Sequence, residues 1–165
     1  MKKNEPLIIE TVISDENSIL SPFSGKEPTI SGEFADYLET SLPHASKTET
    51  IQLLFQCDTI TPDEEKTYER AIKNYYEREF EKTNLDLKRN GVGSLIMLIL
   101  GALFLSLVIT MTTLELSEVL TGIFDILAWV FVWEAMDLFF FRRREISEKR
   151  KKCQAILSAE ILFNK

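Results

Sequence analysis

The sequence is poor in the residues from which catalytic and metal sites are usually built. It has one histidine, two cysteines and no lysine or arginine between Arg89 and Arg142. Cys57 and Cys153 are too few for a disulfide framework, and no Cys/His cluster has the spacing of a zinc site. His44 is predicted to lie in a surface loop. No motif for catalysis or for a cofactor stands out, so we expect a protein that is not an enzyme and that uses no cofactor or metal.

Acidic residues outnumber basic ones in residues 1–90. Residues 1–90 hold 18 of the 26 acidic residues but only 11 of the 19 basic ones. An acidic surface argues against nucleic-acid binding, because that needs Lys and Arg to neutralise phosphates. The N-terminal stretch MKKNEPLIIETVISDE also lacks the long apolar run and cleavage site of a signal peptide. We therefore expect a soluble, acidic region at the start of the chain.

Two long apolar runs follow this region. Residues 92–114 contain no charged residue, and 23 residues are enough for a helix to cross a hydrocarbon core of about 30 Å. Residues 119–141 are also apolar, although three carboxylates interrupt them. Only residues 115–118 separate the runs, too few for a domain. The sequence thus predicts two transmembrane helices joined by a short external turn.

The charges that flank these runs predict the orientation. Lys82, Lys88 and Arg89 precede the first run, and two basic clusters at 142–144 and 149–152 follow the second. The connecting turn has no basic residue. By the positive-inside rule, both termini are expected to be cytoplasmic in a multi-pass protein of the cell membrane.

The soluble part is expected to be a small α/β unit over residues 1–61. Its predicted elements are strands at 7–13 and 50–60, which are rich in β-branched or alternating apolar residues, and an amphipathic helix at 33–42. Cys57 is expected to be buried in the second strand.

A long helix is predicted to follow this unit. Thr61, Pro62 and Glu64 form a capping box with proline at the first helical position. The helix over 62–90 is expected to lead directly into the first span, and Gly91 and Gly93 could allow a bend there.

A basic helix over residues 142–165 is expected to pack against this helix as a cytoplasmic stalk. Its apolar stripe is Ile146, Cys153, Ile156, Leu157, Ile161 and Leu162. The fold class predicted is a mainly α membrane protein, a two-helix transmembrane hairpin with a helical stalk and a small N-terminal α/β unit.

Carboxylates within a span are candidate functional residues. Glu134 and Asp137 share one helix face, and Asp137 precedes Arg142 by about 7.5 Å along a helix. Two interpretations are open. The two carboxylates can pair with basic residues at the membrane surface, or they can form a proton, ion or metal site.

Asp125 is the third candidate. It is predicted to lie deeper in the second span and on the face opposite Glu134. Its expected partners are the hydroxyls of Ser106, Thr110 or Thr112 in the first span, a kind of contact that usually holds helices together.

The basic clusters are candidates for contact with lipid or with a partner. Their members are Arg142, Arg143, Arg144, Lys149, Arg150, Lys151 and Lys152. They could attract anionic lipid or pair with the acidic region. Their role in setting the topology also explains them without either contact.

Several segments together resemble a family of bacterial two-span membrane proteins that has no assigned activity. They are the run AWVFVWEAMDLFFFRRRE, the later AEILF, and the segments 71–77 and 34–39. The resemblance covers most of the chain. It implies the same two-span topology, and it assigns no functional residue.

Two functions are therefore expected. The first is a membrane-anchored, non-enzymatic interaction or accessory protein that contacts the lipid bilayer and either a protein partner or further copies of itself. The second is an oligomeric component of an ion or proton transporter or channel. The second needs self-association, because two helices cannot enclose a pore.

Overall fold

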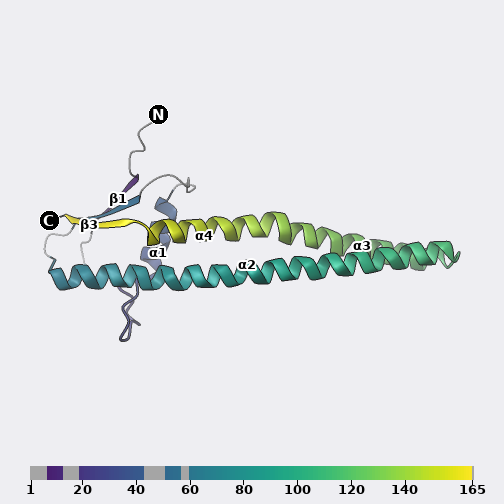
Figure 1. Cartoon of the computed structure of the whole chain (residues 1–165), viewed down its shortest axis with the longest axis horizontal. Coiled ribbons are helices and arrows are strands. Elements are labelled where there is room, and N and C mark those ends of the chain that lie inside the picture. Colours follow the sequence, from purple (N-terminus) through teal and green to yellow (C-terminus); the bar gives the residue numbers. More distant parts are fainter. Residues whose placement is uncertain (1–6, 13–18, 43–50, 57–59, 165) are drawn as a thin grey trace, which may run out of the picture. The chain divides into compact units, whose positions relative to one another are not determined.

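A computed structural model gives the structure of residues 7–12, 19–42, 51–56 and 60–164. Most of its helices and strands are labelled in Figure 1. The chain divides into two compact units, one made of residues 1–83 and 148–165 and the other of residues 84–147. We call them the α/β unit and the hairpin unit.

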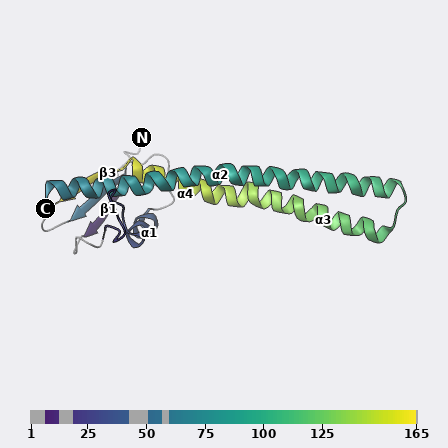
Figure 2. The same ribbon diagram turned by 90° about the horizontal axis from the view of Figure 1, so that it is seen from below.

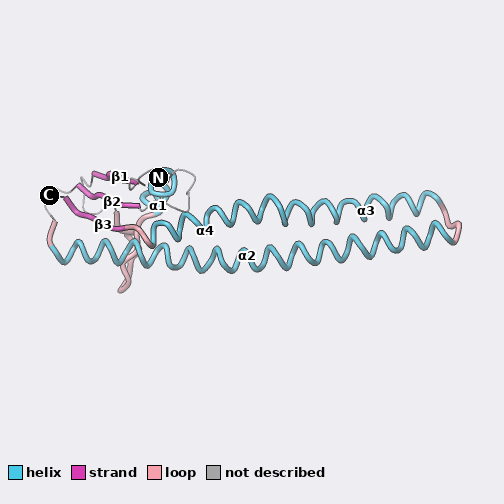
Figure 3. Tube along the Cα trace, turned by 45° about the horizontal axis from the view of Figure 1, so that its top comes forward, coloured by secondary structure: helices cyan, strands magenta, loops and turns pink. Residues whose placement is uncertain are grey.

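The α/β unit is built on a parallel sheet of three strands in the order β1, β2, β3 (Figure 3). The strands are β1 (Leu7–Val12), β2 (Ile51–Gln56) and β3 (Glu160–Asn164). Ile9 lies opposite Leu53, which lies opposite Ile161. The first and last parts of the chain therefore meet in one sheet.

The α/β unit also contains helix α1 (Gly32–Ser41), the first part of α2 (Pro62–Thr113) and most of α4 (Arg143–Leu157). The helices pack on one face of the sheet. Phe34 of α1 lies 6.1 Å from Phe55 of β2 between ring centroids, and the Tyr76 hydroxyl of α2 donates to the Ala35 carbonyl at 3.3 Å. This arrangement follows from the strand order, because two crossovers of the same hand that both step to the next strand place their helices on the same side.

A single core joins this face to the helices. Its most deeply buried side chains are Leu38, Leu53, Phe55, Ile72, Tyr76, Cys153 and Ile156. Burial raises the pKa of the Cys153 thiol to about 11, so this thiol stays protonated at neutral pH. The two predicted strands and the amphipathic helix are confirmed, except that Ile60 is not part of β2 and Leu42 lies just beyond α1. His44 and Cys57 lie outside the described residues.

The capping box at the start of α2 is confirmed. The Thr61 backbone N–H donates to the Glu64 carboxylate at 2.7 Å, and the Glu64 N–H donates to the Thr61 hydroxyl at 3.4 Å. Pro62 is the first helical residue. The helix then continues without a break to Thr113, so the glycines at 91 and 93 do not interrupt it.

The hairpin unit pairs the second part of α2 with α3 (Glu118–Asp137), and the two lie side by side after a short turn (Figure 2). Glu115 in this turn has φ of 51°, a left-handed conformation that non-glycine residues adopt at a cost. A π-helical segment, η1 (Leu138–Arg142), follows α3 directly and leads into α4.

Two helical stretches, within 62–113 and 118–157, are long and apolar enough to cross a membrane. Only 11% of the residues in the most apolar window of each are buried in the structure. The apolar side chains of these helices are therefore mostly exposed. In the core helix of a soluble protein, such side chains would be buried.

The expectation of a helix over 142–165 is wrong at its end. Helix α4 stops at Leu157, and residues 160–164 form strand β3. Ile161 and Phe163 point toward the core while their neighbours point away, which is the alternation of a strand. The spacing of Ile156, Leu157, Ile161 and Leu162 also fits a helix, so the short run was ambiguous.

Candidate functional site in the hairpin unit

Small residues line the seam between α2 and α3. Ser94 and Gly101 on α2 are buried, as are Ala128 and Ala135 on α3. Both pairs are seven residues apart, so each lies along one face of its helix. Small residues at such positions let two helix backbones approach closely, which is typical of helix pairs in membranes.

Gly101 lies where α2 and α3 are closely packed. A Cβ atom added there would lie 2.7 Å from Cγ2 of Val132 and 3.3 Å from its backbone nitrogen. Phe104, which follows Gly101 on α2, stacks on Phe124 and on Phe131 of α3, with ring centroids 5.9 and 5.3 Å away. The two helices are thus in direct contact over several turns.

The π-helical segment lies where the seam ends. Widening the turn leaves the Leu138 carbonyl bonded to the N–H of Arg143, five residues on. Two side chains of α2 contact carbonyls at this place. The Asn90 amide donates to the Leu138 carbonyl at 2.7 Å, and the Ser94 hydroxyl donates to the Ala135 carbonyl at 3.0 Å. We call these two bonds the Asn90–Ser94 clamp.

Asp125 lies on the seam face of α3, three residues before Ala128, and is half-buried. The predicted partners do not contact it. The hydroxyls of Ser106, Thr110 and Thr112 donate instead to carbonyls three or four residues earlier in their own helix. Each hydroxyl has a single proton, and a carbonyl of the same turn is always within its reach. This expected cross-helix contact is therefore wrong.

Glu134 and Asp137 are both exposed on the outer surface of α3. In the part of the chain that the structure describes, neither forms an ion pair with Arg142, Arg143 or Arg144, or with the basic residues of α2. Arg143 lies over the Phe139 ring, 5.5 Å from its centroid. The structure thus does not bring the three carboxylates together, and it leaves two of them facing outward.

The second basic cluster is largely engaged inside the α/β unit. Lys149 pairs with Glu79 at 2.8 Å, Arg150 lies 5.4 Å from the Phe80 ring centroid, and Lys152 donates to the Glu39 carbonyl at 2.8 Å. Lys151 is exposed. Of the roles considered for this cluster, pairing with the acidic region is observed between Lys149 and Glu79.

Glu79 is the centre of this contact. Lys149 and Lys82 both donate to the same oxygen, Oε1, at 2.8 and 3.3 Å. The hydrogen bond from Lys149 is the main cause that lowers the pKa of the Glu79 carboxyl, and the same bond raises the pKa of Lys149. These bonds tie α4 to α2 on the solvent side of the core.

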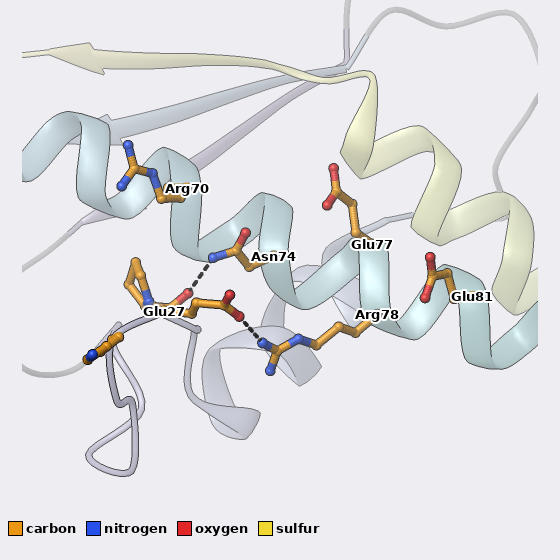
Figure 4. A pocket seen from close by; sticks show the side chains of 8 residues that line it. Glu27, Arg70, Asn74, Glu77, Arg78 and Glu81 are labelled. Atoms are coloured by element: carbon orange, nitrogen blue, oxygen red, sulfur yellow. Dashed lines mark hydrogen bonds and ion pairs between the residues drawn. The ribbon is translucent and has the colours of Figure 1, made fainter.

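A shallow polar pocket of about 460 Å³ lies on the other side of α2 (Figure 4). The Arg78 guanidinium pairs with Glu27, and the Asn74 amide donates to the Pro28 carbonyl at 3.0 Å. The figure shows both bonds joining the 26–28 loop to the helix. The charged groups that line the pocket are of both signs and mostly exposed, so these contacts mainly attach the loop.

Comparison with protein-family models, with curated proteins and with solved structures gave no match. Sequence reasoning located the three carboxylates but missed the Asn90–Ser94 clamp. The signal available was the pair of polar residues at i and i+4, Asn90 and Ser94, at the start of an apolar run.

Proposed function

We propose that the chain is a membrane-anchored, non-enzymatic interaction or accessory protein. The hairpin unit would span the bilayer, and the α/β unit would carry the interaction surface. The observation that carries the proposal is the outward exposure of both apolar stretches, with only 11% of either window buried. A lipid bilayer is the surrounding that makes such exposure favourable.

The seam supports an anchor. Four of its buried residues are small, and the Asn90 and Ser94 side chains of α2 donate hydrogen bonds to backbone carbonyls across the seam. Small residues and interhelical hydrogen bonds hold helices together in lipid, where the hydrophobic effect does not.

We further propose that both termini are cytoplasmic, since every basic residue near the spans lies outside the 90–141 segment. Cysteine labelling tests this orientation. In a background with Cys57 and Cys153 replaced by serine, Ser117→Cys should react with an impermeant reagent in intact cells. Lys3→Cys and Lys165→Cys should react only after permeabilisation. The reverse pattern would disprove the orientation.

Membrane insertion itself is tested by extraction of isolated membranes at alkaline pH. The protein should stay in the membrane pellet under alkaline carbonate and be released by detergent. Release by carbonate alone would show that the apolar helices are covered by protein instead of lipid, and would overturn the proposal.

One observation favours the second candidate, a component of an ion or proton pathway. Asp125 is half-buried in an apolar helix and has no hydrogen-bond partner among the described residues. Asp125→Asn separates the two functions because the amide is nearly isosteric but cannot ionise. An anchor should keep its assembly and its cellular role, whereas a transport component should assemble normally and lose function.

A further inference from the structure

None of the helices that the structure describes covers the second face of the parallel sheet. Parallel sheets occur almost always with both faces covered by helices. Here α1, α2 and α4 all pack on the first face. Most side chains that point the other way are exposed, and Gln52 and Leu54 are half-buried. Ile8 is 52% exposed, Val12 69% and Leu162 38%.

The pairing of the strands defines this second face. Glu10 lies opposite Leu54, which lies opposite Leu162, and this row crosses the middle of the sheet. The rows on either side are Ile8, Gln52, Glu160 and Val12, Gln56, Asn164. The face thus has an apolar centre and flank, two carboxylates, and no lysine or arginine at any of these strand positions.

The charge decides between classes of occupant. An anionic lipid surface or a nucleic acid would be repelled by Glu10 and Glu160. A second copy would place carboxylates against carboxylates. A partner surface with apolar side chains next to Lys or Arg would instead complement both features of the face.

The size of the face matches one helix. A six-residue strand is about 20 Å long, and three strands span about 10 Å between the outer two. A helix is about 10 Å across and rises 1.5 Å per residue, so a helix of about 13 residues covers the face. We propose that this face binds an amphipathic helix of a partner protein that carries basic residues beside its apolar stripe. The residues that would contact the helix are Glu10, Leu54 and Leu162 in the central row, with Ile8 and Val12 in the rows on either side. The inference rests on the proposed interaction function and names the chemistry of the partner.

The direct test uses the full chain in nanodiscs of neutral phosphatidylcholine and two fluorescent 13-residue helical peptides. One peptide is built of leucine and lysine, the other of leucine and glutamate. The leucine–lysine peptide should bind the protein with a Kd in the micromolar range, as expected for a small face. It should bind empty nanodiscs at least tenfold more weakly, and the leucine–glutamate peptide should not bind. Equal binding of both peptides, or equal binding to empty nanodiscs, would refute the inference.

Two variants and two matched controls locate the binding. Val12→Arg and Glu10→Lys should each weaken the leucine–lysine peptide at least tenfold. Phe23→Arg changes a side chain that is 93% exposed but lies off the sheet, and Glu77→Lys reverses an exposed charge on α2. Both controls should bind like the unchanged protein. Equal weakening by the controls would place the peptide elsewhere.

Cross-linking in cells separates this inference from the proposed function. A photo-reactive residue at position 12 should cross-link, and the captured peptide should map to a basic amphipathic helix of another protein. A cross-link only to a second copy, or none from protein that fractionates with membranes, would overturn the partner while leaving the anchor intact. Protein that fractionates as soluble would instead remove the proposed function.

Discussion

The Asn90 side-chain amide donates to the Leu138 carbonyl at 2.7 Å, from one apolar helix to the other. One turn further along α2, the Ser94 hydroxyl reaches the Ala135 carbonyl. Leu138 begins the π-helical segment. In its wider turn the backbone hydrogen bonds join residues five apart, whereas those of a regular α-helix join residues four apart, so carbonyls are more accessible to other donors. The clamp therefore holds the irregular segment in place against α2.

Loss of the clamp should loosen the helix pair. Asn90→Ala is expected to lower stability by about 1 kcal/mol, since an interhelical hydrogen bond in lipid is worth roughly 0.6–2 kcal/mol. Thermal unfolding in detergent measures the change. Ser106→Ala is the control, because that hydroxyl bonds only to its own helix. Equal effects of the two substitutions would show that Asn90 contributes nothing across the seam.

The second prediction concerns close packing at Gly101. Gly101→Ala places a methyl group 2.7 Å from the Val132 side chain and should cost about 1–3 kcal/mol through overpacking. Gly122 has no atom within 4 Å of an added Cβ. Gly122→Ala should therefore be neutral or stabilise by up to about 1 kcal/mol from helix propensity. Unfolding midpoints in one detergent compare the two, and the same sign for both would contradict the described seam.

The third prediction is a dependence on pH centred on Glu79. Its pKa is lowered in the folded protein, so its contribution is present above the unfolded value of 4.5 and is lost as pH falls through the folded value. Glu79→Gln should cost about 1 kcal/mol at pH 7. The difference from the unchanged protein should shrink below pH 4.5 and vanish once the carboxyl is protonated. Denaturant unfolding at a series of pH values measures it, and a constant difference down to pH 2.5 would exclude the charge contribution.

The fourth prediction uses the left-handed Glu115 in the turn. Glu115→Gly should stabilise the hairpin unit by about 1 kcal/mol, because glycine adopts a φ of 51° without a steric cost. Glu118→Gly removes the same side chain at the start of α3 and should destabilise by up to about 1 kcal/mol. Thermal unfolding in detergent distinguishes them. A loss of stability in both would mean that the side chain of Glu115 matters more than its backbone.

Local patterns made most of the elements predictable. The capping box at Thr61 and Glu64, the charge-free run after it and the helix before Pro43 are all signals within a few residues. Strand β3 was missed because its partner is far away in sequence: Glu160 bonds to Gln52, 108 residues earlier. A pattern of five residues cannot predict a strand pairing with such a distant segment. The π-helical segment LFFFR likewise has no sequence signature that separates it from an α-helix.

The residues of the candidate site could be predicted from the sequence, but the hydrogen bonds that they form could not. The face of α3 on which Asp125 lies follows from counting residues along a helix. That it has no hydrogen-bond partner among the described residues depends on where the Ser and Thr hydroxyls of α2 donate, and these hydroxyls donate to carbonyls of their own turn.

The order of the strands in the sheet determines when, during synthesis, the sheet can form. β2 precedes both apolar helices in the chain, whereas its neighbour β3 follows them, so both helices must be synthesised between the two strands. When the ribosome has released only the first helix, β3 has not yet been synthesised. The edge of β2 that pairs with β3 is then unpaired, and Phe55 lacks its contact with that strand. With the proposed insertion, the sheet closes only after the second helix has returned across the bilayer. A chain whose hairpin fails to insert would then keep an open, apolar strand edge, the kind of surface that quality-control proteases and chaperones recognise.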